Sequence, residues 1–308
     1  MIRAAIGGFA TLPAETRGAL AMVVATFFFI AMDSVAKALG DHLPPMMVVW
    51  ARYASQSLLL VICLAPSLGA LMRTQAPGLQ VLRGVLLFTV TALFFTALSY
   101  IPLAEAIALT QSAPLFVTLL ATLVLGERVG PRRWAAVVVG LVGALLIVLP
   151  EDAEMGFRPA SLLALSAAVC FAGFQVLTRH LANTAAAEGA RPGDGVWTTM
   201  LYTSLVGTVL ASATLPWTWV TPVPAAWPGM VAIGAAGLIG HAIFVWAAGQ
   251  VPASVLAPFN YLALVWATLA GLVIFGEQPS AQTLLGAAII VGAGLYVWQR
   301  ERRLAGVR

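Results

Sequence analysis

Charged residues are scarce in this 308-residue sequence, where Lys, Arg, Asp and Glu together make up only 9%. A soluble globular chain carries charge on about a quarter of its residues, because water must wet its surface. Apolar residues make up 61% of the sequence, and the mean hydropathy is +0.95. This composition excludes soluble enzymes, nucleic-acid-binding proteins and disordered scaffolds, and it predicts an integral membrane protein embedded in the lipid bilayer.

Residues that build cofactor, metal or nucleotide sites are also few. The two cysteines, Cys63 and Cys170, lie within apolar runs and form no spaced pair, which excludes a disulfide framework and a metal knuckle. No Walker A sequence is present, which argues against an ATP-driven pump. No HExxH helix or nucleophile with a nearby base is found either, so we expect no catalytic residues, no metal and no cofactor.

The apolar residues fall into ten runs, each near the roughly 20 residues that a helix needs to cross a bilayer. The predicted spans are 18–39, 46–66, 80–99, 103–125, 132–149, 159–180, 196–215, 229–248, 253–275 and 282–299. The first span is full length and lacks a small-residue cleavage site, so it is predicted to be a retained helix rather than a signal peptide.

The 16 Lys and Arg residues are unevenly distributed among the loops. An N-terminus in the cytoplasm places 13 of them on that side, as the positive-inside rule requires: Arg3, Arg17, Arg73, Arg83, Arg128, Arg132, Arg133, Arg179, Arg191, Arg300, Arg302, Arg303 and Arg308. The net charge of +4 is small, so it indicates orientation rather than phosphate binding. Both termini are therefore predicted to be cytoplasmic, in a bacterial inner membrane.

The sequence contains an internal repeat. Residues 101–127 align with residues 251–277, and a proline opens each segment while a Gly-Glu pair closes it. A second alignment pairs Asp33 with Gln175. The predicted divisions are an N-terminal tail (1–17), two five-span halves (18–150 and 158–300) and a C-terminal tail (301–308).

Five spans per half force the second half to insert upside down relative to the first. The charges agree, because GERVGPRRW at 126–134 carries three arginines whereas the matching FGEQPSAQ at 275–282 carries none. Inverted repeats are typical of secondary transporters, whose substrate site lies near the midplane between the repeats. The predicted fold class is an all-α membrane protein with ten transmembrane helices in two inverted five-helix repeats.

Four segments carry a resemblance to a known family: YIPLAEA at 100–106, APLFVTLLATLVLGERV at 113–129, SLLALSAAVCFAGFQVLTRHLA at 161–182 and LAPFNYLALVWATLAGLVIFGEQPS at 256–280. The chain resembles the drug/metabolite transporter superfamily, specifically its EamA-type ten-helix members, among them aromatic amino acid exporters. The resemblance implies a central cavity that is walled by helices from both halves and opens alternately to each side. One departure is Pro114, which aligns with Leu264 while Pro258 lies six residues earlier, so the kinks of the two halves are not expected to match.

Ionisable residues within membrane spans are costly and are therefore candidates for function. Asp33 and Lys37 stand one helical turn apart, where they can form an ion pair while Lys37 extends to the outer headgroups. Alternatively, Asp33 can titrate during transport, or the pair can bind a zwitterionic substrate. Arg52, about two turns into its span, can bind a substrate carboxylate or pair with Asp33. His241 aligns with Thr91 of the first half and is a candidate for proton coupling or for an interhelical hydrogen bond.

Uncharged polar and aromatic residues complete the candidate substrate site, with packing or membrane-interface roles as the alternative. Gln111 and Thr110 match Tyr261 and Asn260, which follow Pro258. Such groups, placed just after a helix opening in both halves, are predicted to line the cavity. The other candidates are Tyr53, Trp266 and Gln175, the last of which replaces the acid at the position of Asp33.

Three further carboxylates are assigned structural roles. Glu105 is predicted to occupy the first turn of its helix, where the helix dipole favours an anion. Glu127 and Glu277 follow a glycine at a turn and are predicted to cap the next helix.

The leading hypothesis is a secondary active transporter that exports amino acids or related small amphipathic metabolites. The alternatives are an uptake carrier of the riboflavin or S-adenosylmethionine type, a non-transporting receptor or assembly subunit, and an intramembrane enzyme. The oligomeric state stays open, with a monomer as one option.

Overall fold

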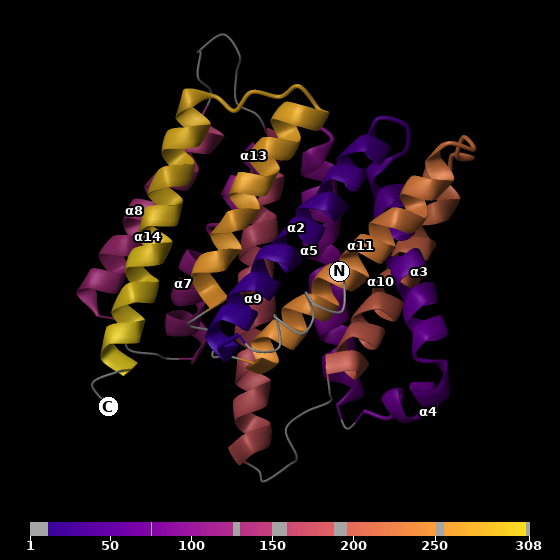
Figure 1. Ribbon diagram of the computed structural model, residues 1–308, viewed down its shortest axis with the longest axis horizontal. Coiled ribbons are helices and arrows are strands. Elements are labelled where there is room, and N and C mark those ends of the chain that lie inside the picture. The colour runs from indigo at the N-terminus through magenta and orange to yellow at the C-terminus, as the bar shows by residue number, and fades with distance from the viewer. Residues whose placement is uncertain are drawn as a thin grey trace.

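The chain folds into a bundle of helices that lie side by side (Figure 1). The computed structural model describes residues 12–74, 76–125, 130–149, 159–187, 196–250 and 256–305, and within these ranges every regular element is a helix. The long elements are α2 (Ala14–Gly40), α3 (Pro45–Cys63), α5 (Pro77–Leu98), α6 (Leu103–Thr110), α7 (Ala113–Leu125), α8 (Pro131–Val148), α9 (Pro159–Ala187), α10 (Val196–Thr218), α11 (Ala226–Gln250), α13 (Leu262–Ile274) and α14 (Ala281–Ala305). The short ones are η1 (Ala65–Ser67), α4 (Leu68–Leu71) and η2 (Ala257–Tyr261).

These helices account for the ten predicted spans. Eight helices in the described ranges are long and apolar enough to cross a membrane, and two shorter apolar helices, Trp134–Val148 and Pro258–Ile274, accompany them. The predicted fold class is thereby confirmed. Boundaries differ by a few residues, as at the last predicted span, 282–299, which is part of the longer α14. Residues 253–255 of the ninth predicted span lie outside the described residues.

The two halves pack together with equivalent helix pairings in both directions. The first helix of the first half, α2, packs on α11 and α13, whereas the first helix of the second half, α9, packs on α5, α6 and α7. The second helices, α3 and α10, pair at one side of the bundle, and the last helices, α8 and α14, pair at the opposite side (Figure 1). Equivalent helices thus have equivalent partners, which is the arrangement expected of inverted repeats.

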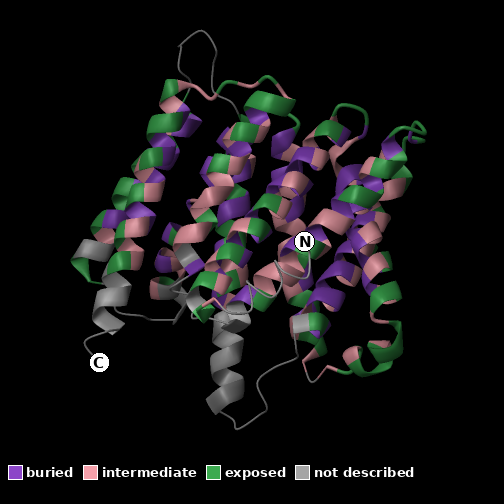
Figure 2. Cartoon of the chain, in the orientation of Figure 1, coloured by how far each residue is buried: buried purple, intermediate pink, exposed green. Residues whose placement is uncertain are grey.

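Large apolar side chains cover the outside of the bundle. Val209, Leu123 and Val273 are 68%, 71% and 82% exposed, and Figure 2 shows exposed positions along the outermost helices, such as α14. A soluble protein rarely leaves so extensive an apolar surface in contact with water. The helices satisfy their own backbone hydrogen bonds, so lipid chains can cover this surface. The fold is that of a multi-pass membrane protein.

The fourth helix of the first half is interrupted, and a 3-10 helix lies at the matching position in the described part of the second half. In the first half, α6 ends at Thr110 and α7 begins at Ala113, with a turn at Gln111 and Ser112. In the second half, η2 ends at Tyr261 before α13 begins, and Tyr261 aligns with Gln111 in the repeat. Irregular backbone thus lies at equivalent positions of the two halves, as a turn in the first and as a 3-10 helix in the second.

Candidate functional site

Arg52 is buried within the bundle, with a relative exposure of 4%. Its Nη1 donates a hydrogen bond of 2.8 Å to the hydroxyl of Thr91 on α5, and its Nε donates one of 3.3 Å to Met32 Sδ on α2. The guanidinium also lies over the rings of Tyr53, at 4.7 Å, and Phe95, at 5.9 Å. A buried guanidinium needs such partners, and these fix its position between α2, α3 and α5.

Tyr53 and Thr91 reinforce each other beside the guanidinium. The Tyr53 hydroxyl donates to the Leu87 carbonyl at 3.0 Å and lies 2.8 Å from the Thr91 hydroxyl. The Tyr53 ring also lies directly against Gly207 of α10, where a Cβ would collide with it. Tyr53 is therefore a buried residue of the α3–α10 contact rather than a residue of the membrane interface.

Asp33 and His241 both interact electrostatically with Arg52. Asp33 is 5% exposed, and His241 lies on α11 with its Nδ1 donating to the Gly237 carbonyl at 2.8 Å. The ring of His241 meets the ring of Phe29 edge-on, with centroids 4.8 Å apart. The structure therefore brings Asp33, Arg52 and His241 together, along with Thr91, the residue that matches His241 in the repeat.

Gln56 belongs to the same group and is a residue that the sequence reasoning missed. It follows Arg52 by one helical turn on α3, is 5% exposed, and its Oε1 is buried without a hydrogen-bond partner among the described residues. A Cβ placed on Gly237 would lie 3.4 Å from this oxygen. The spacing of four residues from Arg52 was the signal available in the sequence. We call Asp33, Arg52, Gln56, Thr91 and His241 the Arg52 cluster.

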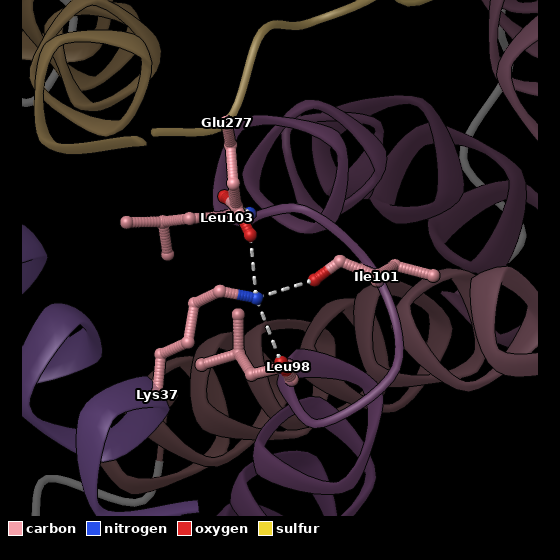
Figure 3. A network of polar contacts seen from close by, with 5 residues as sticks. All are labelled: Lys37, Leu98, Ile101, Leu103 and Glu277. Atoms are coloured by element: carbon pink, nitrogen blue, oxygen red, sulfur yellow. Dashed lines mark hydrogen bonds and ion pairs between the residues drawn. The ribbon is translucent and has the colours of Figure 1, made fainter. Parts of the chain in front are cut away.

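Lys37 pairs with Glu277 rather than with Asp33 (Figure 3). Lys37 Nζ lies 2.9 Å from Glu277 Oε1 and donates to the carbonyls of Leu98, at 3.0 Å, and Ile101, at 2.9 Å. Three acceptors thus use all three hydrogens of the ammonium group. The ion pair expected within α2 is replaced by one between the two halves, because the α5–α6 turn supplies the extra acceptors that a single helix face lacks.

Glu277 caps a helix other than the predicted one. Its Oε2 accepts a 2.9 Å hydrogen bond from the backbone N–H of Leu103, the first residue of α6, whereas the prediction was a cap on the helix that follows in sequence. Gly276, with φ of +65°, reverses the chain after α13 and directs Glu277 towards the first half. We call the contacts of Lys37 and Glu277 with Leu98, Ile101 and Leu103 the Lys37 network.

Of the other two carboxylates with predicted structural roles, only Glu105 lies within the described residues. Glu105 lies in the first turn of α6, as predicted, and its Oε1 also accepts a 2.7 Å hydrogen bond from the Ser161 hydroxyl at the start of α9. Glu127 lies outside the described residues. So do four of the 13 arginines used to predict orientation, namely Arg3, Arg128, Arg191 and Arg308.

The turn between α6 and α7 contacts the 3-10 helix η2. Gln111 Nε2 donates a 3.0 Å hydrogen bond to the backbone carbonyl of Asn260, which joins the first half to the second. The hydroxyl of Tyr261 lies directly against Gly294 of α14, where any side chain would collide with it. The predicted group of Gln111, Asn260 and Tyr261 is thus assembled at the contact between the repeats.

The remaining two candidates lie apart from both groups. The Trp266 ring on α13 meets the Phe27 ring of α2 edge-on, with centroids 5.7 Å apart, and its Nε1 is buried without a hydrogen-bond partner among the described residues. Gln175 has an exposed side chain on α9. The structure does not bring Gln175 to Asp33, the residue that it matches in the repeat.

Comparison with known proteins agrees with this architecture. The model of the EamA-like transporter family matches twice, over residues 16–149 and 158–298. A solved crystal structure has the same fold, with a TM-score of 0.62 and 23% identity, over 94% of this chain and 99% of the other. The chain belongs to the EamA-like transporter family and is a multi-pass membrane transporter, not an enzyme.

The relatives carry different substrates. The chain is 29% identical to an S-adenosylmethionine uptake transporter of Rickettsia bellii, over 89% of this chain and 90% of the relative. It is 30% identical to a riboflavin transporter of Rhizobium johnstonii, over 93% and 92%. It is 31% identical to the pseudopaline exporter CntI of Pseudomonas aeruginosa, over 90% and 94%. Both directions of transport are represented among these relatives.

Proposed function

We propose that this chain is a secondary active carrier that exports a small amphipathic metabolite bearing an amino acid group. The observation that carries the proposal is the buried guanidinium of Arg52, positioned where helices of the two halves meet. Arg52 contacts α2 and α5 of the first half and interacts with His241 on α11 of the second. A charge at this depth is costly unless it serves binding or transport.

Arg52 retains hydrogen-bonding capacity for a substrate. A guanidinium has five N–H donors, and in the described ranges Thr91 and Met32 engage only Nη1 and Nε. Nη2 therefore remains available for an anion. A carboxylate matches this planar donor geometry better than any other small anion except phosphate. The substrate class that best fits the site is a metabolite with a carboxylate.

Substrate passes through the bundle by alternating access between the repeats 18–150 and 158–300. The Lys37 network joins the halves at the end of α2, where the chain turns into α3, and the Gln111–Asn260 contact joins them within the fourth helices. Since arginine is concentrated in loops at the other end of α2, the Lys37 network lies on the outer side. Both termini are then cytoplasmic in a bacterial inner membrane.

Uptake is the second candidate direction, because the S-adenosylmethionine transporter of Rickettsia bellii, which is similar over 89% of this chain, is an uptake carrier. S-adenosylmethionine also carries an amino acid group, so the same Arg52 site serves either direction. The direction then follows from the gradients that drive the carrier rather than from the residues of the binding site.

Flux measurements in proteoliposomes test the proposal. Purified protein is reconstituted and loaded with L-phenylalanine, S-adenosylmethionine or riboflavin, and exchange of the labelled compound is followed. We expect exchange of L-phenylalanine or S-adenosylmethionine that is lost in Arg52→Gln, whereas exchange of riboflavin alone would contradict a carboxylate-bearing substrate. Binding without exchange would support a receptor or assembly subunit instead, and the absence of both exchange and binding would overturn the proposed substrate class.

A further inference from the structure

Three side chains of the α2–α3–α11 contact carry hydrogen-bond acceptors that no donor among the described residues engages. They are the carboxylate of Asp33, Oε1 of Gln56 and Nε2 of His241. Oε1 of Gln56 is buried without a partner among the described residues. The Gly237 carbonyl can only accept, so Nδ1 of a neutral His241 carries the hydrogen and Nε2 is left as an acceptor.

The register of α2 against α11 places these groups at one level. Phe29 contacts both Gly240 and His241, Met32 contacts Gly237, and Leu39 contacts Gly229, so the two helices run antiparallel. Asp33 follows Met32 directly and lies one turn beyond Phe29. It therefore lies at the level of Gly237.

Gln56 reaches the same level from α3. Its Oε1 is 3.4 Å from the Cβ position of Gly237, and Met32 Sδ is 3.0 Å from that position. A Cβ at 237 would contact both groups, with Met32 Sδ the closer of the two. The absence of a side chain at 237 lets Gln56 and Met32 approach the backbone of α11.

A buried acceptor without a donor costs about 1–3 kcal/mol. Within the described residues Asp33 also has no hydrogen bond or ion pair, although Arg52 interacts with it electrostatically. Asp33 carries a negative charge when ionised, so the missing donor is best supplied by a cation with several N–H groups. A primary ammonium group has three donors, which matches the number of acceptors.

We propose that Asp33, Gln56 and His241 bind the ammonium group of a zwitterionic amino acid substrate whose carboxylate is bound by Arg52. The inference rests on the proposed function and narrows its substrate class. Since the ammonium and carboxylate groups of an α-amino acid share one carbon, both must be bound within a single cluster. The position of Gln56 one turn from Arg52 on α3 provides that proximity.

The test compares an amino acid with analogues that lack one charged group. Labelled L-phenylalanine and S-adenosylmethionine are the probes for exchange in proteoliposomes, and riboflavin is a probe without an amino acid group. The competitors for L-phenylalanine are 3-phenylpropionate, which lacks the amine, and 2-phenylethylamine, which lacks the carboxylate. The competitor for S-adenosylmethionine is its deaminated derivative.

Three variants separate binding from folding. Gln56→Leu removes the acceptor, and Gln56→Glu keeps one. Ser57→Ala is the matched control, because Ser57 neighbours Gln56 but its hydroxyl lies 2.9 Å from that of Thr208 on α10. We expect Gln56→Leu to weaken apparent affinity for the zwitterion about tenfold, the loss of one hydrogen bond to a charged group. Affinity for the amine-free analogue is expected to stay unchanged.

The outcomes distinguish the two proposals. The ammonium site is overturned if Gln56→Leu lowers the apparent affinity for the zwitterion and for the amine-free analogue equally, or lowers neither affinity. It is overturned as well if Ser57→Ala lowers the affinity for the zwitterion to the same extent. It is also overturned if the wild type exchanges riboflavin but neither zwitterion, an outcome in which the carrier itself stands. If the wild type exchanges none of the three probes, the proposed function fails together with the site.

Discussion

Lys37 Nζ and Glu277 Oε1 lie 2.9 Å apart and link the first helix of one repeat to the segment between the last two helices of the other. The side chains are 15% and 20% exposed, so water screens the pair only in part. Alternating access requires the halves to separate on each side in turn. Under the proposed alternating access, the ion pair between the halves at one end of the bundle is expected to break in each transport cycle.

Removing both partners of the Lys37 network is expected to destabilise the protein by less than the sum of the two single removals. Lys37→Met or Glu277→Gln alone should each lower the free energy of unfolding by about 2 kcal/mol. The first variant leaves the Glu277 carboxylate and two backbone carbonyls without their donor, and the second leaves the Lys37 ammonium without an opposite charge. Lys37→Met with Glu277→Gln should cost less than the sum. Thermal unfolding in detergent measures this double-mutant cycle, and strictly additive effects would show that the pair is not coupled.

The same network is expected to control access from one side. In a Cys63→Ser, Cys170→Ser background, a cysteine introduced by Ile101→Cys should react faster with a membrane-impermeant maleimide once Glu277→Gln is added, because the halves separate more readily. Ser99→Cys, in the same turn but outside the network, is the control position. Equal reactivity with and without Glu277→Gln would contradict a gating role.

Thr91 is expected to act as a positioning residue for Arg52. Thr91→Val keeps the volume but removes the acceptor that lies 2.8 Å from Arg52 Nη1. We expect KM for the transported zwitterion to rise about fivefold, corresponding to the ~1 kcal/mol of one hydrogen bond. Thr89→Val is the control, since the Thr89 hydroxyl bonds only within α5. A loss of thermal stability with unchanged KM would indicate a purely structural role.

The hydrogen bond from Gln111 to the Asn260 carbonyl gives a prediction for which Asn260→Ala is the control variant. Gln111→Leu should lower stability by about 1 kcal/mol, because it removes the donor to the Asn260 carbonyl. Asn260→Ala should have little effect on this bond, since its acceptor belongs to the backbone. Thermal unfolding of both variants tests this prediction. Equal losses of stability in the two variants would mean that the side chain of Asn260, and not the hydrogen bond to its backbone, stabilises the contact.

Proton coupling is expected to depend on Asp33 and His241, the two titratable groups that interact with Arg52. Asp33→Asn and His241→Gln cannot exchange a proton at those positions. The ratio of transport driven by an imposed pH gradient to simple exchange should therefore fall in each variant. An unchanged ratio in both variants would leave the substrate gradient as the driving force.

Periodicity and charge in the sequence were sufficient to predict the architecture. The apolar runs recur in two sets of five, the Gly-Glu pairs at 126–127 and 276–277 stand at equivalent places in the two sets, and bilayer thickness fixes the length of each helix. The burial of Arg52 and the first-turn position of Glu105 were likewise predictable, because each depends on its own helix.

Which side chains contact each other was decided by the tertiary structure alone. Glu277 reads in sequence as the cap of the following helix, yet it binds Lys37 and caps α6, because the first helix of each repeat packs on helices of the other. Gln56 has no distinguishing sequence signal beyond its spacing from Arg52. Its Oε1 is buried without a hydrogen-bond partner because α3 packs against Gly237 of α11. Helix-forming tendency is local, whereas contacts between residues 37 and 277 depend on the packing of two repeats that no local pattern encodes.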